Sequence, residues 1–200
     1  MALQTREQHI KREKATSNIC TAQALLATMA GFYAVYHGPE GIRTIAERIH
    51  SIAVYLEKTI NKLGYKQVNA QYFDTLRFAL PDTISAQQIR TIALSKEVNL
   101  RYFKNGDVGM SIDESTDVAA VNVLVSIFAI AAGQDCTKVD DVPVSNTICK
   151  ELKRQSAYLT HEVFNKYHTE TEMMRYIKRL DRKDISLAHS MISLGSCTMK

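Results

Sequence analysis

The sequence predicts an α+β fold in which long N-terminal helices pack on a small, mainly antiparallel sheet. Three observations lead to this prediction. Apolar residues recur every three or four positions from Thr16 to Leu63, which is the period of a helix. Residues 75–80 instead alternate apolar and polar side chains, as a half-buried strand does. Between two further strand-like runs stands Asn105-Gly106, the dipeptide that best suits a two-residue hairpin turn.

Two helices are expected in the first third of the chain. The first should begin near Ser17 or Asn18, because these residue types favour the helix N-cap. It should end at Gly38, where glycine suits the position after the last helical residue, and Pro39 suits the first turn of the next helix. Gly64 should end that second helix in the same way.

Shorter elements are expected next. Residues 65–68 form a weak candidate for an edge strand. Ser85 and Gln88 have the spacing of a capping box and should open a short helix. Residues 98–104 and 107–112 should be the two strands of the Asn-Gly hairpin.

The rest of the chain predicts mostly helix. Three N-capping residues at 115–117 precede an apolar stripe that ends at Gly133. The apolar period lapses over residues 134–146, which indicates a linker. A short helix is expected at 147–154 and a stronger one at 169–180, with acidic residues in its first turn and basic residues in its last.

Composition limits the class of protein. The chain has 200 residues, 46% of them apolar, which is enough for one domain with a core. The 25 basic and 21 acidic residues are spread along it, so the net charge of +4 indicates neither a nucleic-acid nor a membrane partner. Its longest apolar run, 118–133, is shorter than the roughly 20 residues that span a bilayer. The first ten residues contain Glu7 and do not form a signal peptide.

The cysteines predict reduced thiols in a cytosol-like compartment. They are widely spaced and show no zinc-binding pattern. The four are Cys20, Cys136, Cys149 and Cys197.

The histidines offer little for a metal site. His161-Glu162 and His168 do not have the H-E-x-x-H spacing, so a surface pair is favoured over a metal site. His37 and His50 are expected at or near helix ends, in a structural role.

Two polar stretches are better candidates for a binding site. Lys11, Arg12 and Lys14 precede a helix N-terminus and could bind an anion there, although a solvated approach to the helix is the more common role. Residues 195–198 (Gly-Ser-Cys-Thr) follow His189 and offer two hydroxyls and a thiol, which could bind a carboxylate or phosphate or supply a nucleophile.

Four longer stretches resemble one family closely. They are R-E-K-A-T-S-N-I-C-T-A-Q-A-L-L-A, A-V-Y-H-G-P-E-G, H-T-E-T-E-M-M-R-Y and H-S-M-I-S-L-G-S-C-T-M-K. Together they resemble glycine dehydrogenase (decarboxylating), the P-protein of the glycine cleavage system, over essentially Leu3 to Lys200. One departure is that Ser193 stands where the family usually has proline.

The resemblance implies an oxidoreductase of glycine catabolism that depends on pyridoxal phosphate (PLP) and is a homodimer when full length. A cytoplasmic location is expected, because no targeting segment is seen. Such an enzyme decarboxylates glycine and transfers the aminomethyl group to the lipoyl group of the carrier H-protein. The family has two related halves with the aspartate-aminotransferase fold, and this chain resembles an internal fragment of the single-chain form. Because the family's PLP lysine motif is absent, we expect no catalytic residue, no stable PLP binding and no activity in the fragment alone.

The resemblance also implies a domain organisation. We expect an entry segment from the preceding large domain at 1–16, interdomain helices and the small α+β domain of the first half at 17–133, and a linker at 134–146. Residues 147–200 would form a helical connector and the start of the second half. Judged by its own residues, the chain could instead be a non-enzymatic α+β module that binds other proteins.

Motif membership and side-chain chemistry together identify residues expected to line the active site of the intact enzyme. Cys20 has a second potential role, because a helix N-terminus lowers the pKa of a thiol and favours redox sensitivity, although a small buried filler is an equal alternative. The expected lining residues are Thr16, Ser17, Asn18, Cys20, His189, Ser196, Cys197 and Thr198.

Overall fold

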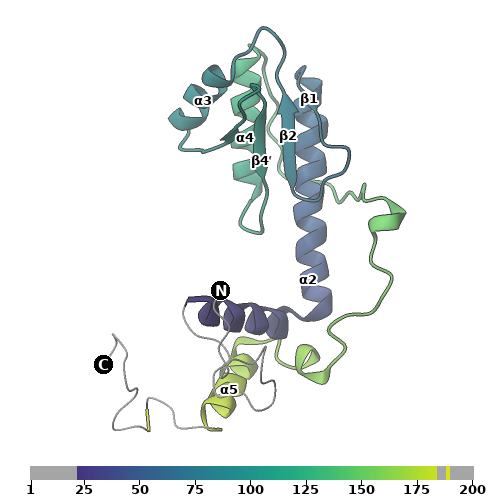
Figure 1. Ribbon diagram of the computed structural model, residues 1–200, viewed down its shortest axis with the longest axis vertical. Coiled ribbons are helices and arrows are strands. Elements are labelled where there is room, and N and C mark those ends of the chain that lie inside the picture. Colours follow the sequence, from purple (N-terminus) through teal and green to yellow (C-terminus); the bar gives the residue numbers. More distant parts are fainter. Residues whose placement is uncertain (1–21, 184–187, 190–200) are drawn as a thin grey trace, which may run out of the picture. The chain divides into compact units, whose positions relative to one another are not determined.

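The chain forms two compact units (Figure 1). The computed structural model describes residues 22–183 and 188–189. Residues Arg43–Ser156 are here called the central unit, and Met1–Ile42 with Ala157–Lys200 are called the terminal unit. The domain boundaries expected from the sequence stay a prediction.

Helix α2 (Ala22–Lys62) contributes residues to both units. The predicted start of the first helix, near Ser17 or Asn18, lies outside the described residues. None of the helices in the described part of the chain has a stretch both long and apolar enough to cross a bilayer.

The central unit is an α+β structure with a four-stranded antiparallel sheet, in the order β1-β2-β4-β3. The strands are β1 (Lys66–Gln67), β2 (Thr75–Ala79), β3 (Arg101–Tyr102) and β4 (Val108–Ser111). The strand predicted at 75–80 and the edge strand predicted at 65–68 are both confirmed. The hairpin strands are confirmed too, but they are shorter than predicted.

The hairpin between β3 and β4 has a three-residue loop, so the predicted two-residue turn was wrong. The Phe103 N–H donates to the Asp107 carbonyl at 2.9 Å, and the Gly106 N–H donates to the Phe103 carbonyl at 3.0 Å. Within residues 104–106 only Gly106 has a positive φ, of 92°. A turn followed by one left-handed glycine is the usual three-residue hairpin, and it leaves the Asn105 side chain to accept the Asp107 N–H at 3.4 Å.

Two capped helices follow the strands in sequence. They are α3 (Ala86–Ser95) and α4 (Val118–Ala131). The Ser85 hydroxyl accepts the Gln88 N–H at 3.1 Å, and the Asp117 carboxylate accepts the Ala120 N–H at 2.8 Å. Only half of the predicted capping box forms, because the Gln88 amide donates to the Ala131 carbonyl at 3.2 Å. That bond ties α3 to the end of α4.

The core lies between these helices and one face of the sheet, behind which α4 passes in Figure 1. Leu76 and Phe78 on β2 are fully buried, whereas Arg77 between them faces the open side of the sheet. Buried residues from each helix complete the core, among them Leu56, Ile60, Ile89, Val121 and Phe128.

Tyr65 links the end of α2 to α4. It follows Gly64, whose φ of 95° ends the helix as predicted. The Tyr65 hydroxyl donates to the Phe128 carbonyl at 2.8 Å, and the two rings pack edge to face at 5.0 Å between centroids. Burial raises the pKa of Tyr65 to about 12, so the phenol stays protonated as a donor at neutral pH.

A sharp kink divides α2 at Gly38, as the sequence predicted. Gly38 has φ 63° and ψ −177°, and Pro39 follows it. Two side chains from the C-terminal part of the terminal unit bind carbonyls beside the kink: His168 Nδ1 lies 2.7 Å from the Tyr36 carbonyl, and the Tyr158 hydroxyl donates to the Pro39 carbonyl at 2.6 Å. These bonds satisfy acceptors at the interruption of the helix.

The last described helix is α5 (Glu170–Asp181), which confirms the prediction for residues 169–180. The Thr169 hydroxyl caps it by accepting the Glu172 N–H at 3.3 Å. The helix predicted at 147–154 is reduced to one 3₁₀ turn, η2 (Lys150–Leu152), and a second such turn is η3 (Glu162–Asn165).

We expect Gly38→Ala to destabilise the terminal unit by about 2 kcal/mol or more. An added Cβ would lie 2.6 Å from His168 Cε1 and 2.7 Å from the Phe164 carbonyl, at a φ that alanine disfavours. Gly31→Ala in the same helix is the matched control, because its Cβ would meet nothing within 4 Å, and it should stabilise by about 0.5–1 kcal/mol. Urea denaturation followed by circular dichroism measures both, and equal midpoints for the two variants would contradict the role of the kink.

Candidate functional site

Most of the residues predicted to line an active site lie outside the described part of the chain. His189 is the exception, and it is an exposed residue in a turn. The structure therefore does not test whether these residues come together. Those outside are Thr16, Ser17, Asn18, Cys20, Ser196, Cys197 and Thr198.

The main cluster of buried polar side chains in the described residues is centred on His50. The prediction that His50 lies at or near a helix end was wrong, because it is inside α2 and only 1% exposed. Its Nδ1 lies 2.8 Å from the Phe73 carbonyl, and its Nε2 accepts the Thr147 N–H at 3.1 Å. Because a carbonyl can only accept, Nδ1 must carry the proton, and the ring is the neutral Nδ1–H tautomer.

Ser51 forms the second attachment of the same kind. Its hydroxyl oxygen accepts the Ser145 N–H at 2.9 Å and lies 2.7 Å from the Glu47 carbonyl and 3.1 Å from the Ser145 carbonyl. Since a hydroxyl has one proton, it donates to one of these two carbonyls at a time. His50 and Ser51 thus hold two backbone amides of a segment almost one hundred residues away in sequence.

That segment, residues 134–149, is here called the connecting segment. It has no regular secondary structure, and side chains satisfy its backbone. The Asn122 amide binds both polar groups of Val139, donating to the carbonyl at 2.9 Å and accepting the N–H at 3.0 Å. Gln134 donates to the Leu63 carbonyl at 3.3 Å. The stretch predicted as a linker is therefore bound to the central unit along its length.

Tyr72 extends the polar cluster around His50. The two rings lie 5.8 Å apart, and the Tyr72 hydroxyl donates to Glu57 Oε2 at 2.7 Å. Burial first, and then the hydrogen bond and negative charge of Glu57, raise the pKa of Tyr72, while a hydrogen bond with Thr147 opposes them. The phenol is therefore held in its protonated form.

The geometry favours an anchoring role over nucleophilic catalysis. The Thr147 hydroxyl lies 3.2 Å from His50 Nε2, which is the distance of a nucleophile from a general base. However, Nε2 already accepts the Thr147 N–H, and the ring is almost completely buried. The imidazole therefore has no exposed nitrogen with which to accept a substrate proton.

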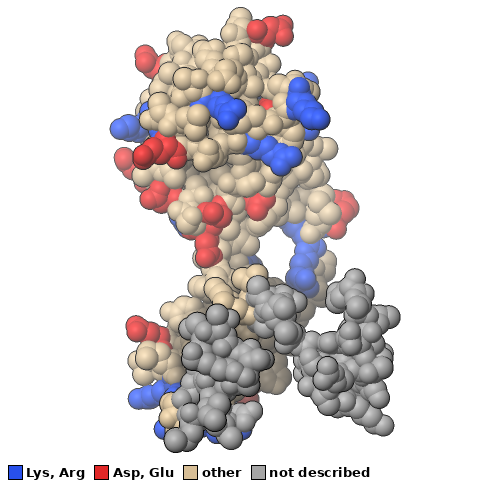
Figure 2. Space-filling view, turned by 60° about the vertical axis from the view of Figure 1, so that its left-hand side comes forward, with Lys and Arg blue, Asp and Glu red and all other residues tan. Residues whose placement is uncertain are grey.

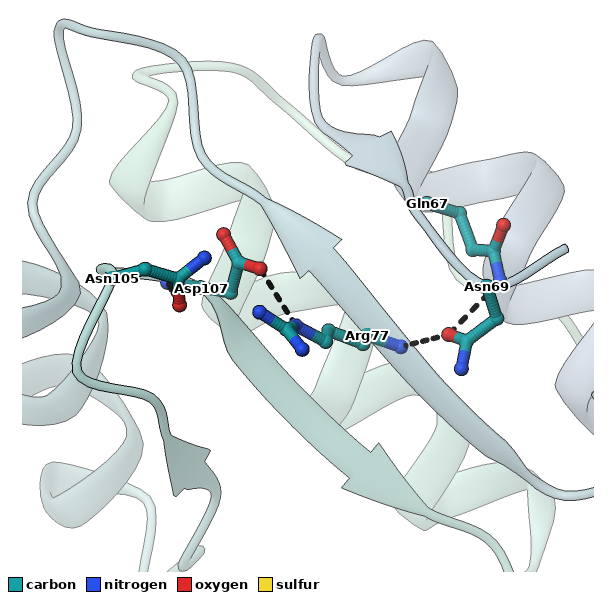
Figure 3. A network of polar contacts seen from close by, with 5 residues as sticks. All are labelled: Gln67, Asn69, Arg77, Asn105 and Asp107. Carbon is teal, nitrogen blue, oxygen red and sulfur yellow. Dashed lines mark hydrogen bonds and ion pairs between the residues drawn. The ribbon is translucent and has the colours of Figure 1, made fainter.

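A second polar network lies on the open face of the sheet (Figure 3). Arg77 Nε lies 2.6 Å from Asp107 Oδ2, and its guanidinium stacks on Phe103 at 4.2 Å from the ring centroid. The Arg77 N–H donates to the Asn69 side chain at 2.8 Å, and Gln67 donates to the same oxygen at 3.1 Å. The network joins β1, β2 and the hairpin, and because it is partly exposed we expect it to add roughly 1 kcal/mol or less.

The described residues do not fit a PLP site. None of their lysines is buried, so none is desolvated in the way that favours a Schiff base. A hollow of about 310 Å³ in the central unit is lined by Glu47 and Asp141, whose carboxylates would repel a phosphate. Its arginine, Arg48, already donates to the Glu114 and Thr116 carbonyls at 2.9 and 2.8 Å.

Metal binding has no support in the described residues either, where no three metal-ligating side chains converge. His161, predicted to form a surface pair, accepts the Val163 N–H and caps η3. His168 binds the Tyr36 carbonyl at the kink.

The sequence reasoning missed His50 and Ser51 as anchors. One signal could have found them. They are consecutive polar residues inside a helix, and the apolar period continues before and after them. If the helix is buried on more than one face there, these side chains need hydrogen-bond partners. The partners, Ser145 and Thr147, have no such signal because their contacts are distant in sequence.

We expect His50→Phe to release the Thr147 amide, because no acceptor replaces Nε2. Hydrogen exchange at Thr147 should become roughly tenfold faster, equivalent to about 1.4 kcal/mol, and Ser51→Ala should do the same at Ser145. Thr147→Val is the matched control, because it removes the hydroxyl contact and leaves the amide bond to His50. Unchanged amide exchange at both positions in the first two variants would show that the anchors do not hold the connecting segment.

Comparison with known proteins gives consistent matches. The family model described as glycine cleavage system P-protein matches residues 1–128. Proteins called glycine dehydrogenase (decarboxylating) are similar over the whole chain, with 84% identity in Bacteroides fragilis (strain YCH46), 80% in Bacteroides thetaiotaomicron and 52% in Flavobacterium johnsoniae. The chain covers 21% of the length of each of these relatives, or about a fifth.

A crystal structure of glycine decarboxylase (P-protein) of the glycine cleavage system, in inhibitor-bound form, is similar to this chain. The alignment covers 64% of this chain and 30% of the chain in that structure. Its identity is 25% and its TM-score 0.49. On the extent of the family match and the identity of the relatives, this chain belongs to the glycine cleavage system P-protein family.

Proposed function

We propose that this chain is part of a PLP-dependent glycine decarboxylase. The whole enzyme would decarboxylate glycine and transfer the aminomethyl group to the lipoyl group of H-protein, and it would be a homodimer. The observation that carries the proposal is 84% identity over all 200 residues with proteins called glycine dehydrogenase (decarboxylating). When bound, PLP would supply the electron sink for decarboxylation.

The first part of α2 supports the proposal that these residues work within a larger structure. Residues 15–39 contain no charged side chain, and Leu25, Leu26 and Met29 are 57–65% exposed. A helix that is apolar all round is normally buried. We infer that the rest of a longer polypeptide covers this helix, which is consistent with relatives about five times as long as this chain.

The described residues would then form a support rather than the catalytic centre. None of their lysines is buried, and the polar cluster at His50 binds backbone groups instead of facing a cavity. We propose that the α+β residues are the small domain of an aspartate-aminotransferase-type half. Its anchored connecting segment would lead towards the second half.

We also propose that the predicted lining residues act in the intact enzyme by binding substrate or cofactor oxygens. Ser196→Ala in the full-length protein should lower turnover without changing the melting temperature, because it removes one hydroxyl donor. Steady-state kinetics with glycine and H-protein measure this effect, and unchanged turnover would exclude the role. The proposed residues are Thr16, Ser17, Asn18, Cys20, His189, Ser196, Cys197 and Thr198.

The 200-residue chain alone should neither release CO₂ from glycine nor show the absorption band of lysine-bound PLP. The full-length protein should do both and should sediment as a dimer. The two are compared after purification in the same buffer with equal added PLP, using CO₂ release and a PLP titration as measurements. A stoichiometric PLP band in the 200-residue chain would contradict the assignment of the cofactor site to other residues, and an inactive full-length protein would contradict the proposed reaction.

A further inference from the structure

Helix α5 separates its charges along its length. Glu170 and Glu172 occupy the first turn, and basic residues predominate in the rest of the helix and just after it, where Asp181 is the one acidic residue up to Lys183. The helix dipole explains cations in the last turn but not Arg175 in the middle. The central unit differs, since Figure 2 shows both signs of charge on its surface, separated by uncharged areas. The basic residues of α5 and its end are Arg175, Lys178, Arg179, Arg182 and Lys183.

One guanidinium in this group is held in place by aromatic rings. Tyr167 and Tyr176 stack at 4.3 Å between centroids with an interplanar angle of 13°. Arg179 lies 5.4 and 5.3 Å from these two centroids, and it donates to the Tyr167 hydroxyl. Phe32 of α2 supports Tyr176 through an edge contact at 6.2 Å. Because Arg179 is already ordered, binding through it loses less side-chain entropy.

Arg179 lines two open hollows, each of about 380 Å³. Arg175 and Arg179 line both of them. The first also contains Lys166, Tyr167, Glu172 and Tyr176, and the second contains Lys178 and Arg182. Among the described residues, no carboxylate pairs with Arg175 or Arg182, whereas Lys178 lies 2.6 Å from Asp181.

Apolar side chains are exposed among these cations. Met174 is 62% exposed and Ile177 is 44% exposed, and both lie on α5. Methionine and arginine are enriched in protein interfaces, which combine an apolar centre with a polar rim. The surface made by Met174, Ile177 and the five basic residues of α5 is here called the α5 basic surface.

We infer that the α5 basic surface docks an acidic face of a partner protein and, resting on the proposed function, that this partner is the carrier H-protein. Charge complementarity sets the sign of the partner's face. Geometry favours a protein over a small anion, because Arg175 and Arg182 are about 10 Å apart along the helix axis, further than one phosphate or carboxylate can bridge. Paired carboxylates on a protein surface match that spacing, with an apolar contact to Met174 and Ile177 between them.

The α5 basic surface would change how fast the two proteins associate, and not the rate of the chemical step. Exposed complementary charges mainly raise the association rate, and salt screens them. Weakening the surface should therefore raise the Kd and KM for the carrier. It should leave the rate at saturating carrier unchanged.

The test uses the full-length protein that contains this chain, loaded with PLP, and purified lipoylated H-protein as the probe. Arg175→Glu with Arg182→Glu should raise the Kd roughly tenfold or more and flatten the dependence of log Kd on log salt concentration. Arg175→Lys with Arg182→Lys keeps the charge and should keep the salt dependence. The matched control is Lys66→Glu with Lys104→Glu, which makes the same charge change on exposed residues of the central unit and should leave binding unchanged.

The outcomes separate the surface from the proposed function. If the unmodified protein neither binds H-protein nor transfers to it, both inferences fail. If it does both and the charge-reversed variant binds equally well, the docking surface alone is refuted. The docking surface is also refuted if the charge-reversed variant still binds H-protein but sediments as a monomer, because the surface would then join two copies of the chain. Melting temperature and turnover at saturating H-protein check that the variants are folded, and a normal turnover with a raised KM supports docking.

Discussion

The imidazole of His50 binds two backbone groups from segments that are far apart in sequence, and the arrangement of the central unit depends on it. Its Nδ1–H satisfies the Phe73 carbonyl ahead of β2, and its Nε2 satisfies the Thr147 N–H in the connecting segment. A buried helix face offers no free backbone donors or acceptors of its own, so an irregular segment can lie against it only where side chains supply them. His50 and Ser51 do this from consecutive positions on α2.

This anchoring explains why α2 is buried on more than one side within the central unit. Residues 50–54 are all buried, although an amphipathic helix on a small domain normally exposes half of its surface. The core of the unit covers one side, and the connecting segment covers another through Ser145 and Thr147. A stretch without secondary structure is thereby as firmly placed as a strand would be.

The terminal unit shows a different balance of packing and exposure. His168 and Tyr158 satisfy carbonyls at the kink, and the stacked tyrosines hold Arg179. Around these ordered contacts, apolar residues of α2 and basic residues of α5 remain exposed. Both kinds of surface make sense in a protein whose relatives are much longer, the first as an interface within the polypeptide and the second as one that meets a partner.

Rules based on neighbouring residues predicted most of the helices and strands and most of the residues at which they end. Periodicity predicted the α+β class. Gly64 and Gly133 follow helix ends with positive φ and Gly38 kinks α2, because glycine adopts this backbone conformation without a Cβ clash. Two details differ from these rules. Gln88 makes a tertiary contact with the end of α4 instead of completing its capping box, and the hairpin closes with a three-residue loop in which only Gly106 is left-handed. The predicted lining residues other than His189 lie outside the described residues, so they stay a prediction.

What the sequence by itself determined was the order of helices and strands, the break at Gly38-Pro39 and, through its long motifs, the family. These depend on spacing and on interactions between close neighbours, which are written along the chain. Only the tertiary structure decided that His50 and Ser51 hold the connecting segment and that Arg179 of the α5 basic surface lies against a stacked pair of tyrosines. Those contacts join residues brought together by packing, and no local pattern in the chain specifies such pairs.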